Sequence, residues 1–290
     1  MGTVLFLDSN NLAIRTLFSD REMVNTPNPD FTLHKHLFLN AIFANMKKFN
    51  PSEVVLAVDD RKNWRKSVYA DYKKHRKENR DKDIFPWDAY FVYMDDWLKE
   101  IKEHLPFKVI QLPYTEADDV IAVISKHLVD TKNIIVTSDS DYVQLLSQKN
   151  IKVWDPFKKA FLAVEDPKKE LAIKVLAGDS GDGVPNVRPK LGPKTAEKLY
   201  VKNEIEKFIS ENNLQAEYER NQRLIDFNFI PAAVTKRILE SYSSYPVHTK
   251  VSTNALFIWF VKNSLRKMSE DAQEITFLLK RCIEHEGDLF

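Results

Sequence analysis

Cysteine is nearly absent from this sequence, which has Cys282 as its only thiol among 290 residues. A single cysteine excludes an intramolecular disulfide and favours a reducing, intracellular compartment. Long hydrophobic runs are missing too, so no segment is suited to crossing a bilayer. Residues 1–8 lack the basic region and the long apolar run of a secretion signal. We therefore expect a soluble, cytoplasmic protein with no membrane partner.

An excess of charge of either sign is also missing. Lysine and arginine number 43 and aspartate and glutamate 42, so the net charge of +1 neither supports nor excludes a polyanionic partner. The hydrophobic fraction of 43% is typical of an ordered globular protein, and 290 residues suffice for one large domain or two smaller ones. No convincing serine or cysteine triad is present, so nothing points to a covalent nucleophile.

What the sequence does contain is acidic residues directly after short apolar strands. These are residues 4–7 with Asp8, residues 54–58 with Asp59 and Asp60, and residues 134–137 with Asp139 and Asp141. Because helical patterns alternate with these strands, we expect an α/β fold with a central, mostly parallel sheet and helices on both faces. The carboxyl ends of parallel strands share one edge, which would bring the acids together. A lone aspartate there is usually a cap or turn residue, but three cases are hard to assign to capping alone.

Two further acidic segments have both a structural and a functional interpretation. They are Glu116, Asp118 and Asp119 before the apolar run 120–124, and Asp179 with Asp182 in a glycine-containing turn. A helix start explains the first, since Thr115 and Asp118 have capping-box spacing and acids suit the helix dipole. An ordinary loop explains the second. Clustered carboxylates are also what Mg²⁺ and Mn²⁺ bind, and the strand-end acids favour that interpretation.

Residues 61–82 form a basic segment between two of these acidic groups. The segment has ten lysines and arginines against three acids, with Trp64, Tyr69 and Tyr72 between them. Such a run is usually a solvated helix face. Interleaved aromatics suit a single-stranded nucleic acid better, because bases stack on rings while cations follow the phosphates. A basic arm over an acidic rim would also let a polyanionic substrate approach bound metals.

The C-terminal third of the sequence reads as helical. Gly192, Pro193, Lys194 and Thr195 begin one helix, whose free N–H groups would suit a phosphate, although Pro193 in an ordinary first turn explains the pattern equally well. Strand signals stop near residue 180. We therefore expect an α/β domain over residues 1–180, with a basic arch at about 61–85, and a helical domain over residues 181–290.

In order and approximate spacing, these motifs resemble the 5′ nuclease (flap endonuclease) superfamily, and the likeness to its phage ribonuclease H branch covers nearly the whole chain. The resemblance implies a PIN-like α/β core, a helical arch and a helix-three-turn-helix-like motif that binds duplex. It also implies 5′-to-3′ exonuclease and flap endonuclease activity on DNA and RNA–DNA duplexes with 5′ ends, forks or flaps. The expected role is removal of RNA primers during lagging-strand replication, in the host cytoplasm if a phage encodes the protein.

The resemblance further implies two Mg²⁺ ions, for which Mn²⁺ substitutes, about 4 Å apart. The implied ligands of the first ion are Asp8, Asp59, Glu116, Asp118 and Asp139. Those of the second are Asp141, Asp179 and Asp182, with Asp118 or Asp119. Lys73 and Arg76 would lie over the scissile phosphate and act with Asp139 and Asp141 in catalysis. The implied nucleic-acid contacts are Arg65, Lys66, Tyr72, Lys73, Arg76, Gly192, Lys194 and Thr195.

Several alternatives remain open at the level of sequence. One is a non-catalytic, structure-selective nucleic-acid binder, and another is a small-molecule phosphohydrolase, which leaves residues 61–82 without a role. The tail 284–290 resembles peptides that bind a sliding clamp, although a frayed helix end explains it as well. A single-stranded DNA-binding protein is a second expected partner, and we expect a monomer.

Overall fold

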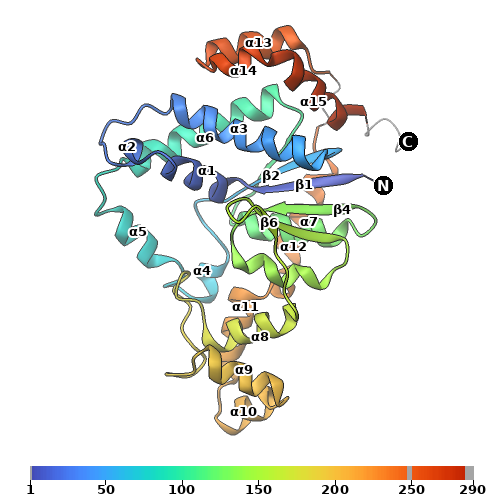
Figure 1. Cartoon of the computed structure of the whole chain (residues 1–290). Helices are drawn as coiled ribbons and strands as arrows, with labels where there is room; N and C mark the ends of the chain where they lie inside the picture. The colour runs from blue at the N-terminus through green and yellow to red at the C-terminus, as the bar shows by residue number, and fades with distance from the viewer. Residues whose placement is uncertain (1, 247–249, 285–290) are drawn as a thin grey trace.

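The computed structural model describes residues 2–246 and 250–284 and confirms an α/β protein (Figure 1). Its sheet has the strand order β3-β2-β1-β4-β5-β6, with β1 to β5 parallel and β6 antiparallel to β5. The strands are β1 (Thr3–Asp8), β2 (Glu53–Val58), β3 (Lys108–Gln111), β4 (Lys132–Val136), β5 (Ile151–Asp155) and β6 (Ala160–Phe161). The three predicted strands are β1, β2 and β4. β3 and β6 are short edge strands with little apolar pattern, and we did not predict them or β5.

Helices cover both faces of the sheet, because successive strand residues point in opposite directions. In β1, Leu5 and Leu7 enter one core, and Val4 and Phe6 enter the other. The first face carries α1 (Ser9–Phe18), α2 (Arg21–Val24), α3 (Thr32–Phe49) and α6 (Trp87–His104), with α13 (Thr253–Lys262), α14 (Arg266–Glu270) and α15 (Ala272–Glu284) outside them. The second carries α7 (Ala117–His127), α12 (Ala232–Ser243) and the 3-10 helices η1 (Ser140–Ser147) and η2 (Phe227–Phe229).

The remaining helices extend beyond the sheet; in Figure 1, α5 lies to the left of the sheet and the others lie toward the lower end of the view. They are α4 (Arg65–Val68), α5 (Lys74–Arg80), α8 (Pro167–Ala177), α9 (Pro193–Val201), α10 (Ile205–Glu211) and α11 (Gln215–Ile225). Two small cores hold these helices together, except for α5, which has no buried residue. One core lies around Val175 and Leu224, and the other lies around Leu176 and Ala196. The domain division at residue 180 stays a prediction. Of the later helices, α12 contacts β3 and α15 contacts β2, so the C-terminal part of the chain also packs against the sheet.

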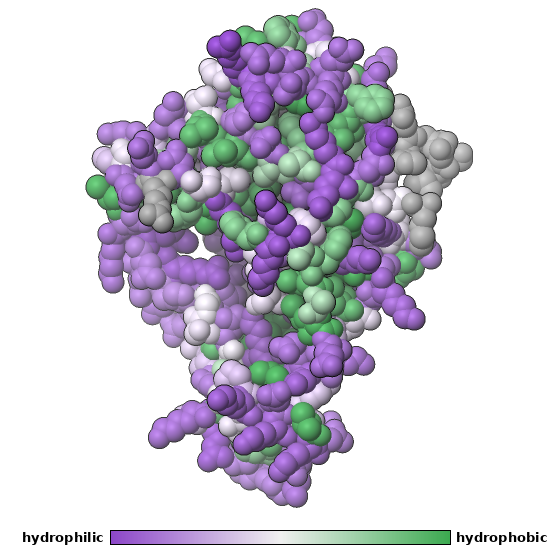
Figure 2. All heavy atoms as spheres, viewed as in Figure 1, coloured by the Kyte–Doolittle hydropathy of each residue, from purple (hydrophilic) through white to green (hydrophobic). Residues whose placement is uncertain are grey.

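The register of the sheet aligns the strand ends at which the acids stand. Leu7 pairs with Leu56 of β2 and with Val136 of β4. Asp8 and the residues that follow β2 and β4 therefore emerge at the same edge. Figure 2 shows an opening through the molecule with hydrophilic atoms around it, where Figure 1 has α5 on one side and this edge of the sheet on the other. None of the described helices combines the length and apolar character needed to span a membrane.

Candidate active site

Three carboxylates predicted to bind the second metal lie together. One oxygen each of Asp141, Asp179 and Asp182 lies within 4.8 Å of the other two. Asp141 stands in the first turn of η1, and the other two share the turn that follows α8. Gly178 begins this turn with a φ of 74°, and a Cβ there would lie 2.4 Å from the carbonyl oxygen of Val184. The turn that presents Asp179 and Asp182 therefore requires a glycine.

Lys174 on α8 is a charged neighbour of this trio that we did not predict. Its Nζ contacts Asp141 and lies 2.8 Å from Oδ2 of Asp179. Burial lowers the pKa of Lys174, but Asp141 and Asp179 together raise it, so the pKa lies above its ordinary value. The lysine therefore stays charged between two carboxylates. Nothing in the local sequence distinguishes Lys174 from the other lysines of α8, and only the fold brings it to the acids.

The acids at this edge have lost hydration and repel one another. Desolvation and Asp59 raise the pKa of Asp8 to about 7. Desolvation raises the pKa of Asp141 to about 6, although Lys174 opposes the change. Desolvation and Asp8 also raise the pKa of Asp118. The site thus holds more negative charge than its own cations offset, and its donor set of carboxylate oxygens fits a hard divalent cation.

The acids predicted for the first metal are held by hydrogen bonds from neighbouring elements. Three of them accept hydrogen bonds from backbone N–H groups: Asp8 from Asn11 at 2.9 Å, Asp59 from Ala117 at 2.7 Å, and Asp139 from Asp141 at 2.9 Å. Asp118 accepts a hydrogen bond from the hydroxyl of Tyr142 at 2.7 Å. Asp8 interacts electrostatically with both Asp59 and Asp139, so the fold brings these acids to one edge. The proposed ligands of the first metal are Asp8, Asp59, Glu116, Asp118 and Asp139. Among the described residues, however, no three of these carboxylates lie as close together as Asp141, Asp179 and Asp182 do.

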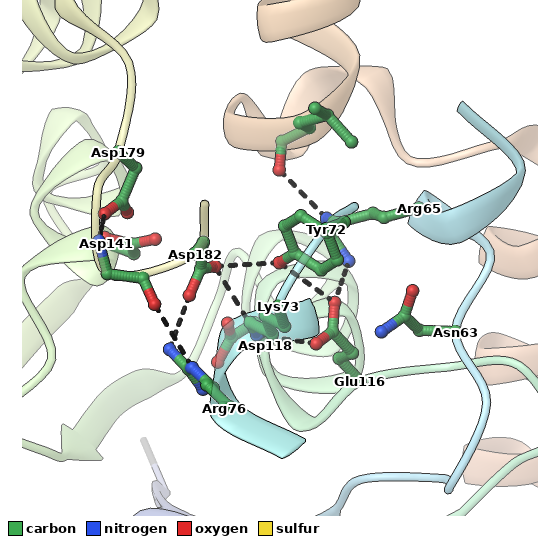
Figure 3. Close-up of polar contacts among 12 residues, drawn as sticks. Asn63, Arg65, Tyr72, Lys73, Arg76, Glu116, Asp118, Asp141, Asp179 and Asp182 are labelled. Atoms are coloured by element: carbon green, nitrogen blue, oxygen red, sulfur yellow. Dashed lines mark hydrogen bonds and ion pairs between the residues drawn. The ribbon is translucent and has the colours of Figure 1, made fainter. Parts of the chain in front are cut away.

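Side chains of the basic segment reach into the acids (Figure 3). Lys73 has a φ of 55°, and its Nζ lies 2.6 Å from Oε1 of Glu116 and 3.5 Å from Oδ2 of Asp182. Arg76 pairs with Asp182 through Nη2 and donates to the carbonyl oxygen of Gly181 at 3.2 Å. The hydroxyl of the buried Tyr72 donates to Asp182 at 2.8 Å. Lys73, Arg76 and Tyr72, which we predicted to contact the nucleic acid, thus contact carboxylates that we predicted to bind metal.

Arg65 and Asp119 form a second, fully buried cluster beside the trio. Their side chains are 3% and 0% exposed, and Nη2 of Arg65 lies 2.8 Å from Oδ1 of Asp119. Nη1 donates to Glu116 at 2.9 Å, and Nε donates to the carbonyl oxygen of Leu224 at 3.0 Å. Asp119 also accepts from Nε1 of Trp64 at 2.9 Å. The protein itself thus satisfies both side chains, which leaves Arg65 no free surface for a nucleic acid.

The capping box at the start of α7 differs from the predicted one. We expected Thr115 and Asp118 to form it, but the N-cap is Glu116 and its partner is Asp119. The backbone N–H of Glu116 donates to Oδ2 of Asp119 at 3.1 Å, whereas the hydroxyl of Thr115 donates to the carbonyl oxygen of Pro113. The box is displaced by one residue, and its Asp119 also pairs with Arg65. Asp118 is thereby left to face the acids.

The remaining predicted nucleic-acid residues lie on the surface and away from the trio. Lys66 is exposed on α4, and Lys194 and Thr195 are exposed in the first turn of α9. Gly192 is the N-cap of α9, and no side chain caps this helix. Pro193 has no N–H and the N–H of Thr195 donates to the carbonyl oxygen of Gly192 at 3.0 Å, so only the N–H of Lys194 in this first turn is left without a side-chain or backbone cap among the described residues.

Family models describe most of the chain. The model described as "5′-3′ exonuclease, N-terminal resolvase-like domain" matches residues 3–173, and the model "T4 RNase H, C terminal" matches residues 193–275. The ribonuclease H of Enterobacteria phage T4 is 28% identical, over 93% of this chain and 95% of that protein. The flap endonuclease Xni of Shewanella denitrificans is 33% identical, over 70% of this chain and 78% of its own.

Solved structures show the same fold. The D15 protein of bacteriophage T5, crystallised with metal ions, superposes with a TM-score of 0.65 at 20% identity, over 82% of this chain and 99% of that one. A D155K variant of the T5 D15 flap endonuclease, in a complex with DNA and metal ions, also has a TM-score of 0.65 at 20% identity, over 83% of this chain and 100% of that one.

Proposed function

The chain belongs to the 5′-3′ exonuclease family, and from this premise we propose that it hydrolyses phosphodiesters near the 5′ ends of DNA and RNA–DNA duplexes, forks and flaps. It would act as a 5′-to-3′ exonuclease and flap endonuclease that removes RNA primers during lagging-strand replication. The observation that carries the proposal is the carboxylate trio of Asp141, Asp179 and Asp182, with cationic side chains directly beside it. The T4 ribonuclease H and the Xni flap endonucleases support the same activity.

We propose that Asp141, Asp179 and Asp182 hold one Mg²⁺, and that Asp8, Asp59, Glu116, Asp118 and Asp139 hold a second. Bound Mg²⁺ supplies Lewis-acid chemistry and makes an attacking water available at neutral pH. Raised pKa values of Asp8 (about 7) and Asp141 (about 6) support a cation here, because its charge would offset their repulsion. Asp119 is not in the proposed set, since Arg65, Trp64 and the start of α7 use its oxygens.

The cations beside the acids would serve the substrate. Lys73, Arg76 and Lys174 each contact at least one proposed metal ligand. A metal among the carboxylates would compete with these contacts and leave the cations available to a phosphodiester. Their charge would then stabilise the negative charge that develops on the phosphoryl group. Lys73 and Arg76 lie in the basic arch, at the start of α5, so a substrate strand in the opening beside α5 would contact both side chains.

Two separate surfaces would hold the nucleic acid. Lys66 and the other exposed cations of residues 61–82 would follow a single strand at the opening. The N-terminus of α9, with Gly192, Lys194 and Thr195, would bind a phosphate of the duplex without reading bases. Tyr72 and Arg65 are buried, so their proposed role is to position Asp182, Glu116 and Asp119.

The proposed partners beyond the substrate are a sliding clamp and a single-stranded DNA-binding protein, with the nuclease itself a monomer. The terminal segment proposed for the clamp is 284–290, and all of it after Glu284 lies outside the described residues. A pull-down with the cognate clamp tests this, since deletion of the last five residues should abolish capture. Undiminished capture by the truncated chain would exclude the tail as the binding segment.

A 5′-labelled flap tests the proposed activity against a non-catalytic binder. With Mg²⁺, the wild-type protein should release labelled products near the flap junction, and EDTA should abolish cleavage but not all binding. A matched RNA–DNA duplex should yield short 5′ products. Binding of both substrates without any product, with Mg²⁺ or Mn²⁺, would show that the chain is a binder rather than an enzyme.

A further inference from the structure

Tyr114 has an unusual backbone conformation for a large side chain. Its φ is 61°, in the left-handed region, which bulky non-glycine residues rarely adopt because the conformation is strained. The side chain is 50% exposed and belongs to none of the hydrophobic cores among the described residues. Packing therefore does not explain why a tyrosine occupies this position.

Two hydrogen bonds hold Tyr114 in this conformation. Its N–H donates to Oδ2 of Asp60 at 2.8 Å, and its carbonyl oxygen accepts from the N–H of Trp64 at 3.1 Å. The N–H of Asp60 also donates to the carbonyl oxygen of Thr115 at 2.9 Å. Asp60, an acid beyond the predicted metal ligands, thus joins the loop after β2 to the loop after β3. The chain uses it to fix the backbone of Tyr114.

The position of Tyr114 places its ring at the base of the arch. In the sequence, Tyr114 lies two residues before Glu116, and Asp60, which accepts a hydrogen bond from its N–H, directly follows Asp59. The basic segment begins beside it, and Nζ of the exposed Lys62 lies 5.8 Å from the centre of the ring. An exposed ring next to a cation is the arrangement that holds unpaired bases in single-strand binding proteins.

We propose that Tyr114 is a stacking platform for an unpaired base of the substrate strand, with Lys62 neutralising the adjacent phosphate. The proposal rests on the proposed function and deepens it, because it names a residue that favours unpaired 5′ strands over fully paired ends. The backbone strain is maintained by Asp60 and Trp64 so that the ring projects outward.

The test replaces the ring without disturbing the backbone. Asparagine and glycine adopt the left-handed region readily, so Tyr114→Asn and Tyr114→Gly should melt at or above the wild-type temperature. Both should raise KM for a 5′-flap substrate about tenfold, within the range for loss of one base–aromatic stack, and the loss should fall on KM rather than kcat. Tyr114→Phe keeps the ring and should keep the wild-type KM. Phe277→Asn, which removes another exposed ring on the remote helix α15, should leave KM unchanged.

A flap with abasic sites in its unpaired strand identifies the partner of the ring. These sites should raise KM for the wild-type protein and for Tyr114→Phe but have little further effect on Tyr114→Asn. Equal KM values for the asparagine variant and the wild type, or the same abasic effect in both, would overturn the platform. Failure of the wild-type protein to cleave any flap would instead count against the proposed nuclease, so the two failures are distinguishable.

Discussion

Two clusters of opposite charges lie side by side in this protein, and they differ in how fully their charges are satisfied. Asp119 and Arg65 are buried, paired in two places and supplied with further hydrogen bonds by Trp64 and Leu224. Asp141 shares its cation Lys174 with Asp179, and its pKa is raised to about 6. The first cluster is complete without a ligand and serves the fold. The second has unsatisfied negative charge and is suited to bind a metal.

The largest expected effect comes from the incomplete cluster. Asp141→Asn should lower flap cleavage about 10³-fold or more, comparable to loss of a principal transition-state contact. The melting temperature without metal should stay the same or rise, because the folded state disfavours the charge that this change removes. Asp139→Asn should be similarly inactive. A product ladder from a 5′-labelled flap and a thermal melt measure the two quantities, and cleavage by Asp141→Asn near the wild-type rate would refute the role of the trio.

The complete cluster should respond in the opposite way. Arg65→Met leaves the buried charge of Asp119 without a cation and Glu116 with Lys73 alone, so unfolding should require about 3–5 kcal/mol less free energy. Urea unfolding measures the change. Lys66→Met, a neighbouring exposed position on α4, is the matched control and should leave stability within about 0.5 kcal/mol. Equal stability of the two variants would mean that Arg65 does not organise the site.

Lys73 connects the two clusters, and its loss should separate catalysis from binding. Lys73→Ala should lower kcat about 10²-fold, because its charge would face the reacting phosphate. Binding of a duplex, measured in Ca²⁺ or EDTA, should weaken far less, since the proposed duplex contacts are at α9. Arg80→Ala removes a charge from the end of α5 and serves as the control. Equal losses of kcat and binding in Lys73→Ala would argue that this lysine only attracts the nucleic acid.

The smallest expected effect is the pH dependence of metal stabilisation. The pKa values of Asp8 (about 7) and Asp141 (about 6) lie above the ordinary aspartate value of 3.8. Between about pH 4 and 7 the folded protein therefore binds more protons at these groups than the unfolded chain, and without metal their contribution to stability falls as pH rises. Mg²⁺ competes with those protons, so its stabilising effect should grow over the same range.

His34 provides the internal reference for that experiment. Burial lowers the pKa of His34 to about 4, from the ordinary 6.5, so its contribution to stability rises with pH between those values. It lies between α1 and α6, bonded to Ala13 and Tyr93 and to none of the proposed metal ligands, so we expect its effect to be the same with and without Mg²⁺. The difference between melting temperatures with Mg²⁺ and with EDTA isolates the acids, and a difference that does not change with pH would contradict their assignment.

The sequence was sufficient to predict the α/β fold and the acids at the strand ends, because apolar runs that stop at an aspartate identify buried parallel strands. Asp141 follows the same pattern, whereas Asp179 and Asp182 stand in a turn after a helix, and it was the family resemblance that grouped them with Asp141. Lys174 was not, since a lysine on a helix has no local pattern that indicates its partner. Neither was the burial of Arg65, whose basic surroundings are typical of an exposed face and whose partners Asp119 and Leu224 are distant in the sequence.

Crystals soaked in Mn²⁺ would test the contrast between the two clusters most directly, because anomalous scattering locates the ion without reference to activity. We predict a peak bonded to Asp141, Asp179 and Asp182, with Lys174 displaced from the trio and the Arg65–Asp119 pair unchanged. An absent peak at the trio, or an ion bonded to Asp119 in place of Arg65, would contradict the account.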